Sequence, residues 1–218
     1  MTAADTKYPH PKDILHILPI LFLHMNLTTS LFRLDKNRHQ GYTVHMIDAS
    51  ATVYETARIV GDSDQFHLGP HSQIDDFVFC FIGKSCHIGR NVHIASFCSI
   101  IGGGEVTMED FSGLSAGCRI ITGSDDFTGP WLTNPTVPEE FTNVKRGTIH
   151  IKRHAVLGSN AVVYPNVTIG EGAAVGAGCL VRKDLEPWTI YAGTNPKPVG
   201  KRDKDAILAK ERAYLDSE

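Results

Sequence analysis

The sequence has no surplus of positive charge and no glycine-rich loop of the nucleoside-triphosphate-binding type. Its 218 residues include 21 lysines and arginines against 24 aspartates and glutamates, which gives a formal net charge of −3 at pH 7. Domains that bind nucleic acid carry a clustered basic surface, so we expect no nucleic-acid partner. Without a Gly-x-x-x-x-Gly-Lys-Ser/Thr motif, the sequence also argues against ATP as a ligand.

Paired cysteine motifs are missing as well. The five cysteines are an odd number with no Cys-x-x-Cys spacing, at Cys80, Cys86, Cys98, Cys118 and Cys179. This pattern predicts neither a zinc framework nor a full set of disulfides. We therefore expect no metal, reduced thiols and a cytoplasmic location.

The longest apolar stretch, residues 14–32, is not an uninterrupted hydrophobic run. It contains four residues that are costly in a bilayer core, namely His16, Pro19, His24 and Asn26. It also lacks the basic start and the small-residue cleavage site of a signal peptide. We expect residues 1–45 to be a helical extension in which this stretch covers an end of the domain, with no membrane partner; attachment to a membrane surface is the alternative.

What the sequence does contain is a period of six. Aliphatic residues recur at this spacing, apart from short excursions and one long gap between Ile120 and Ile151. These anchors are Ile47, Val53, Ile59, Leu68, Ile74, Ile82, Ile88, Ile94, Ile100, Met108, Leu114, Ile120, Ile151, Leu157, Val163, Ile169, Val175 and Val181. Short strands joined at sharp corners produce such a period, and three strands close a coil of about eighteen residues. Eighteen anchors predict six stacked coils around one aliphatic column.

A second position keeps the same phase. The residue four after each anchor is small in every repeat except the last, where it is Leu185. These positions are Ala51, Ala57, Ser63, Ser72, Val78, Cys86, Val92, Cys98, Gly104, Ser112, Cys118, Ser124, Ala155, Ala161, Val167, Ala173, Cys179 and Leu185. Four of the five cysteines fall here, so we expect them to pack inward as small apolar side chains.

Residues 47–202 resemble the hexapeptide-repeat acyltransferases, most closely over residues 151–183 and in the exit motif at residues 191–196. The resemblance implies a left-handed parallel β-helix, although the general rule for parallel crossovers favours the right hand, and it implies a homotrimer. We accordingly divide the chain into an N-terminal helical extension (1–45), a β-helix domain (46–191) with a long loop (122–148), and a C-terminal tail with a short helix (192–218).

One edge of the predicted coils gathers candidate substrate-binding residues. His67 and His87 precede anchors of the same face, so they lie in successive coils about 4.8 Å apart. We place the departure of the long loop at the same corner, and a loop of this length inside a tight repeat is typically functional. Solvated corner positions are the alternative for the two histidines. In the loop, Trp131 and Asn134 are suited to stack on and hydrogen-bond a sugar or nucleobase; Trp131 could equally fix the loop to a neighbouring subunit.

The catalytic base is the point where this sequence departs from the family. The resemblance to sugar acetyltransferases implies a histidine just after Ile120–Thr122, but this sequence has Asp125, with Asp126 beside it. Aspartate is a weak base at neutral pH unless burial raises its pKa, so the departure favours an amine acceptor over a hydroxyl. We predict that His93 is the base or orients the amine, with Asp125 and Asp126 assisting; a solvated corner role is the alternative for His93.

The donor site is implied by the resemblance alone. In acetyl-CoA-binding members the pantetheine arm lies in the groove between subunits, which corresponds here to Gly158, Ser159, Gly176 and Ala177. Four cations are placed to meet the phosphates, namely Arg182, Lys183, Lys201 and Arg202. Solvated surface charges are the alternative for each of them.

These observations together predict an acetyl-CoA-dependent N-acetyltransferase. The acceptor is expected to be a dTDP- or UDP-linked amino-dideoxy sugar, as in the family members that act on dTDP-4-amino-4,6-dideoxyglucose, in lipopolysaccharide O-antigen or another glycan pathway. A sugar O-acetyltransferase is the alternative. A zinc enzyme of the γ-carbonic anhydrase type needs three imidazole ligands, whereas the expected geometry brings together only two. A non-catalytic scaffold would not need the donor-groove residues.

Overall fold

The computed structural model describes residues 46–218. The expected helical extension at residues 1–45, with its apolar stretch, lies outside the described residues. Among residues 46–218, the single α-helix is neither long nor apolar enough to cross a membrane.

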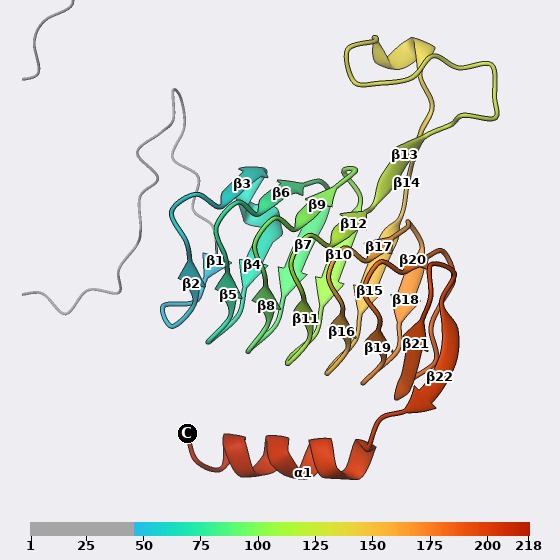
Figure 1. Ribbon diagram of the computed structural model, residues 1–218. Coiled ribbons are helices and arrows are strands. Elements are labelled where there is room, and N and C mark those ends of the chain that lie inside the picture. Colours follow the sequence, from blue (N-terminus) through green and yellow to red (C-terminus); the bar gives the residue numbers. More distant parts are fainter. Residues whose placement is uncertain (1–45) are drawn as a thin grey trace, which may run out of the picture. The chain divides into compact units, whose positions relative to one another are not determined.

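Six coils wind through three sheets, and each coil adds one parallel strand to each sheet (Figure 1). The first sheet contains β1 (Met46–Ile47), β4 (Phe66–Leu68), β7 (Ser85–Ile88), β10 (Glu105–Met108), β15 (Thr148–Ile151) and β18 (Val167–Ile169). The second contains β2 (Thr52–Val53), β5 (Gln73–Ile74), β8 (His93–Ile94), β11 (Gly113–Leu114), β16 (Val156–Leu157), β19 (Ala174–Val175), β21 (Thr189–Ala192) and β22 (Lys197–Lys201). The second sheet is extended beyond the coils by β21, which is parallel to its neighbour β19, and by β22, which is antiparallel to β21. The third contains β3 (Arg58–Gly61), β6 (Phe79–Ile82), β9 (Ser99–Ile101), β12 (Arg119–Ile121), β17 (Val162–Val163) and β20 (Leu180–Val181). The prediction of a parallel β-helix with six coils is confirmed.

The aliphatic column forms the core. All fifteen predicted anchors from Leu68 to Val181 are buried, with exposures of 0–4%. Ile47, in the first coil, is 38% exposed. Because stacked strands repeat the same inward position in every coil, the anchors of the first and second sheets pair in register from coil to coil.

Two details of the predicted register are wrong, both next to an excursion from the period of six. In the third sheet Cys80, not Ile82, pairs with Ile59 and Ile100. In the first sheet the inward position before the anchor holds Phe66, Val106 and Ile149, where counting forward predicted Ser63, Gly104 and Ser124. Extra residues at the corners shift the count, and the sheet register resumes only at the following strand.

The cysteines pack as predicted. Cys86, Cys98, Cys118 and Cys179 are all free and at most 1% exposed. Burial raises the pKa of the Cys179 thiol, as expected for an unreactive packing residue.

Two elements stand outside the coils (Figure 1). The long loop forms an arm in which β13 (Gly123–Asp125) pairs antiparallel with β14 (Val144–Arg146), followed outward by a short 3-10 helix, η3 (Glu139–Phe141). A second 3-10 turn, η2 (Ser63–Gln65), precedes β4. The predicted C-terminal helix is confirmed as α1 (Lys204–Leu215), which begins where the Asp203 carboxylate accepts a hydrogen bond from the Ala206 amide.

Candidate active site

The predicted histidine pair lies on the outer face of the first sheet. His67 and His87 are register partners, and their rings stack with centroids 4.4 Å apart. Burial, followed by the proximity of His67, lowers the pKa of His87. Beside His87 is a cavity of about 340 Å³, which Thr107, Glu109 and Arg153 also line. His67 and His87 are thus close neighbours, as the coil spacing predicts.

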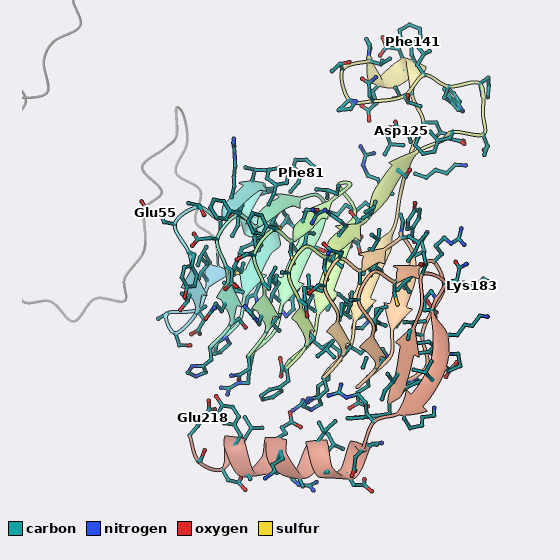
Figure 2. All side chains as sticks on the ribbon, in the orientation of Figure 1. Glu55, Phe81, Asp125, Phe141, Lys183 and Glu218 are labelled. Carbon is teal, nitrogen blue, oxygen red and sulfur yellow. The ribbon has the colours of Figure 1, made fainter. Side chains whose placement is uncertain are left out.

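The arm leaves the coils between the third and first sheets, and its own pairing carries it outward (Figure 2). No hydrogen bond or ion pair within residues 46–218 joins the arm to His67 or His87. The structure therefore does not bring the predicted histidines and the predicted loop residues together within one chain.

Asp126 is committed to the structure of the arm. Its carboxylate accepts hydrogen bonds from the Thr128 hydroxyl at 2.7 Å and the Asn143 amide at 2.9 Å, and it pairs with the Lys145 ammonium at 3.0 Å. The Thr128 hydroxyl and the Lys145 ammonium hold the pKa of Asp126 well below its usual range. A carboxylate in this state holds the hairpin together and is poorly suited to accept a proton.

Asp125 and Asn134, two further predicted residues, do meet. The Asp125 carboxylate accepts a hydrogen bond of 3.3 Å from the Asn134 backbone amide. Trp131 is exposed close by in the sequence, together with three apolar side chains that the sequence analysis did not single out: Phe127, Leu132 and Phe141. The signal for these three was available, since a solvated loop seldom carries so many large apolar residues.

His93 lies on the outer face of the second sheet, where its side chain is 54% exposed. Its Nε2 atom lies 3.0 Å from Oδ2 of Asp75, and Oδ1 of Asp75 accepts a hydrogen bond of 2.7 Å from the Gln73 amide. Partial burial raises the pKa of Asp75, but the hydrogen bonds from Gln73 and His93 outweigh it, so this pKa lies below its ordinary value. Asp75 was missed by the sequence analysis.

The predicted donor residues occupy adjacent corners of the last two coils. The Gly178 amide donates to the Ser159 carbonyl at 2.9 Å, and a Cβ on Gly158 would lie 2.6 Å from the Ala177 nitrogen. Gly158 is therefore required by close coil stacking whatever else it contacts. Gly176 is similarly close to the following strand, since a Cβ on it would lie 3.0 Å from the Tyr191 carbonyl oxygen.

The four predicted cations divide into two pairs. Lys201 donates to the Thr189 hydroxyl at 2.6 Å, and Arg202 donates to the backbone carbonyls of His154 and Gly172 at 2.7 and 3.0 Å. Burial lowers the pKa of Arg202. Both side chains are thus engaged in the fold. Arg182 and Lys183 are exposed, and Arg182 donates a hydrogen bond of 3.3 Å to the Asn195 amide oxygen.

Within residues 46–218, no group of three or more histidine, cysteine, aspartate or glutamate side chains is arranged to hold a metal ion. The stacked His67 and His87 supply two imidazoles without a third ligand.

Comparison with known proteins identifies the family to which this chain belongs. Residues 148–183 match the family model for the bacterial transferase hexapeptide with six repeats. Over 155 residues the chain is 37% identical to dTDP-4-amino-4,6-dideoxy-D-glucose acyltransferase of Escherichia coli, a match that covers 71% of this chain and 80% of that protein. The chain belongs to the hexapeptide-repeat acyltransferases. It is therefore an acyltransferase, and the family resemblance drawn from the repeat is confirmed.

Solved structures of N-acyltransferases are similar to this chain in fold as well as in sequence. A variant of AntD, an N-acyltransferase from Bacillus cereus, in complex with dTDP and coenzyme A, is similar with a TM-score of 0.72 and 30% identity, over 80% of this chain and 92% of that one. AntD in complex with dTDP and 3-hydroxybutyryl-CoA is similar with a TM-score of 0.66 and 33% identity, over 78% and 86% of the two chains.

Proposed function

We propose that this acyltransferase moves an acyl group from an acyl-CoA thioester to the amino group of a dTDP-linked amino-dideoxy sugar. The observation that carries the proposal is the 37% identity, over most of both chains, to the relative named for dTDP-4-amino-4,6-dideoxy-D-glucose. The AntD complexes with dTDP and coenzyme A support the same donor and the same nucleotide.

The reaction itself is a simple exchange at a carbonyl. The neutral amine attacks the thioester carbon, a C–N bond forms, the C–S bond breaks, and the thiolate leaves. The amine nitrogen must lose one proton and the departing sulfur gains one, so the net proton count is unchanged. In this proposal His93 accepts the proton from the amine, and Asp125 on the arm binds the acceptor.

The same proposal includes the acyl group, the hand of the coil, the cellular setting and the contacts of both substrates. We take the transferred group to be acetyl, the coil to be left-handed as in the family resemblance, and the setting to be the cytoplasm, in lipopolysaccharide O-antigen or another glycan pathway. The donor lies against Gly158, Ser159, Gly176 and Ala177, with its phosphates near Arg182 and Lys183. His67 and His87, together with Trp131, contact the sugar nucleotide.

We also propose a homotrimer, because this chain exposes two separate apolar surfaces. Phe77 and Phe97 stack at one corner of the coils with ring centroids 5.2 Å apart, and they are 57% and 59% exposed. The arm exposes Phe127 and Phe141. Two different patches on one chain suit a head-to-tail interface that closes into a ring, in which the arm of one copy brings Asp125 to its neighbour.

A thiol-release assay tests the proposal directly. Acetyl-CoA and 3-hydroxybutyryl-CoA are each offered with dTDP- and UDP-linked 3-amino and 4-amino dideoxy sugars, with plain hexoses and galactosides as hydroxyl controls. Release of CoA with the dTDP-linked amino sugars alone is the expected result. Release with hydroxyl acceptors alone would overturn it.

The second candidate, a sugar O-acetyltransferase, is favoured by one observation. The pairing of His93 with Asp75 supplies an imidazole held by a carboxylate, which is the arrangement that a hydroxyl acceptor requires for general-base catalysis. The hydroxyl controls of the same assay decide between the two acceptors.

A further inference from the structure

The outer face of the second sheet holds a gap beside His93. The outward positions of successive strands form a row in which Gln73 precedes His93 and Gly113 follows it. Gly113 has no side chain, and a Cβ built there would meet only the His93 carbonyl oxygen, at 3.5 Å. His93 therefore has a carboxylate on one side, through Asp75, and open space on the other.

The hydrogen-bond network assigns the ring proton of His93. Gln73 donates its amide hydrogen to Oδ1 of Asp75, which leaves Oδ2 for the imidazole 3.0 Å away. An ionised carboxylate only accepts, so Nε2 of His93 must carry the proton and donate it. The lone pair then resides on Nδ1, for which the described part of the chain provides no hydrogen-bond partner.

We propose that Asp75, held by Gln73, is a positioning residue that fixes His93 as the Nε2-protonated tautomer, leaving Nδ1 free to take a proton from an acceptor seated beside Gly113. This rests on the proposed function. As the C–N bond forms and the C–S bond breaks, the acceptor proton moves to Nδ1, and Asp75 stabilises the imidazolium until the proton returns to solvent or to the departing thiolate. The same logic holds for any histidine base oriented by a carboxylate.

The central test is Asp75→Asn. With Gln73 in its present orientation, its NH₂ group donates to the new amide oxygen, and the new NH₂ group faces His93. A Gln73 amide turned over would accept from that NH₂ group instead, so the tautomer in the variant is read directly by NMR. An NH₂ donates to Nε2 and so forces the proton onto Nδ1, where it blocks proton acceptance. We expect ¹⁵N NMR of the ring to show the Nε2-protonated tautomer in the wild-type protein and the Nδ1-protonated one in the variant. General-base catalysis contributes about 10²–10⁴-fold, so kcat should fall at least about a hundredfold with KM changing by less than about threefold.

A paired substitution separates positioning from a general loss of structure. In the double variant Gln73→Glu with Asp75→Asn, the carboxylate introduced at position 73 accepts from the NH₂ group, and the amide oxygen turns to His93. The Nε2-protonated tautomer should return, with kcat recovering at least about tenfold over the single variant. Asp76→Asn is the matched control: it makes the same charge change one residue away, where the carboxylate contacts Thr56 instead of His93.

The NMR tautomer and the turnover rate test the two proposals independently. The NMR measurement needs no substrate, so a chain that turns over none of the amino-sugar acceptors refutes the proposed function but leaves the tautomer result to judge Asp75. A wild-type ring protonated on Nδ1 overturns the positioning role, and so does an Asp75→Asn variant whose ring is protonated on Nδ1 but whose kcat on an accepted substrate is unchanged.

Discussion

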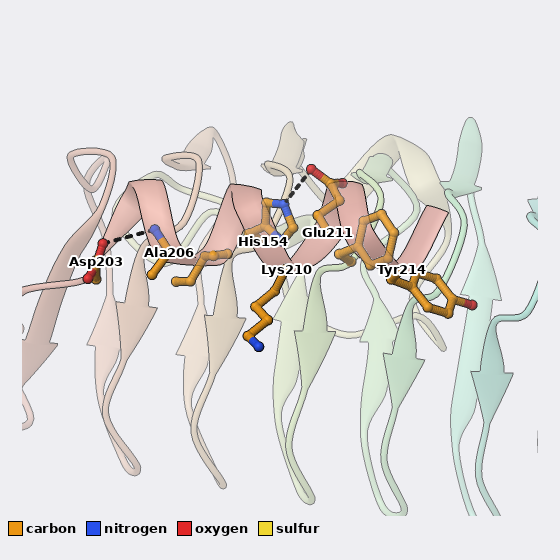
Figure 3. A pocket seen from close by; sticks show the side chains of 8 residues that line it. His154, Asp203, Ala206, Lys210, Glu211 and Tyr214 are labelled. Atoms are coloured by element: carbon orange, nitrogen blue, oxygen red, sulfur yellow. Dashed lines mark hydrogen bonds and ion pairs between the residues drawn. The ribbon is translucent and has the colours of Figure 1, made fainter. Parts of the chain in front are cut away.

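Glu211 should hold α1 against the coils, and removing its charge should release the helix. Figure 3 shows the interface, with His154 and Glu211 joined across it. The Glu211 side chain is 8% exposed; Oε1 accepts from Nε of Arg153 at 2.8 Å, and Oε2 lies 3.2 Å from Nε2 of His154. No residue of α1 is buried as a whole, and a shallow cavity of about 410 Å³ lies between the helix and the coils. Polar contacts therefore contribute much of the docking.

The size of the effect follows from the burial of the two partners. Exposed ion pairs contribute about 0–1 kcal/mol, whereas removing one partner of a fully buried pair costs about 3–5 kcal/mol. Glu211 is nearly buried but Arg153 is 36% exposed, so Glu211→Gln should weaken docking by about 2 kcal/mol. That free energy corresponds to a roughly 30-fold larger undocked population.

Hydrogen exchange measured by mass spectrometry gives the readout. Amides of α1 should exchange about 30-fold faster in Glu211→Gln, while amides of the coil strands keep their protection, because the helix opens as a local unit. Asp205→Asn on the same helix is the control, since it removes an equal charge with no ion pair in the described part of the chain. If the exchange of α1 amides changes by less than about threefold, or if the coils lose protection in parallel, the assignment of docking to this carboxylate is wrong.

The pH dependence of docking has a definite sign. Burial raises the pKa of Glu211, but hydrogen bonds from Arg153 and His154 outweigh it, so the folded-state pKa lies below the ordinary value of 4.5. A depressed pKa stabilises the docked state above pH 4.5, and this contribution disappears as the pH falls through the folded-state pKa. The wild-type and variant exchange rates should therefore converge in acid.

Three further substitutions test the core, the arm and the oligomer. Ile120→Ala, at a fully buried anchor, should destabilise the coils by about 2–5 kcal/mol. The melting temperature in differential scanning fluorimetry should fall by about 5–15 °C, and an unchanged value would contradict the role of the aliphatic column in stability. Asp126→Asn should speed amide exchange in the arm but not in the coils, because the pair with Lys145 is lost, and equal protection would contradict its structural role. Phe97→Ser removes the exposed stack with Phe77. It should raise the dissociation constant of the oligomer at least about tenfold in sedimentation experiments; unchanged assembly would mean that the subunit interface does not include this corner of the coils.

The coils were predictable because one physical requirement repeats in every turn. An inward position recurs whenever the chain completes a face, so Leu68 and Ile169 carry the same signal although they lie about a hundred residues apart. The corners between strands have no comparable inward position, so the sequence does not reveal how many residues each corner holds. Cys80 takes the register position predicted for Ile82, which is buried two residues further along β6, because β6 and its corner hold extra residues. No sequence count shows on which side of a strand such an insertion falls.

The site was predictable only where it follows the same repeat. His67 and His87 share a register position, so their stacking follows from the coil height. The contact of His93 with Asp75 is diagonal, between an outward strand residue and a corner residue of the preceding coil, and it depends on side-chain rotamers. The partners of Arg202 were likewise not predictable from the sequence: its place near the exit motif suggested a phosphate contact, and in the structure its guanidinium donates to two backbone carbonyls.

Two of the carboxylates with depressed pKa values, Asp126 and Asp75, lie near the proposed site, and each has a structural task. Hydrogen bonds keep Asp126 charged to hold the arm, and hydrogen bonds keep Asp75 charged to hold His93. A carboxylate whose charged form is stabilised in this way is a weaker base than a free one, so neither residue is suited to collect the proton that an acceptor loses. An imidazole is suited to it because this group ordinarily titrates near neutral pH, and His93 has its carboxylate on one side and the space above Gly113 on the other. In the proposed mechanism, the two fixed carboxylates therefore organise the site, and His93 moves the proton.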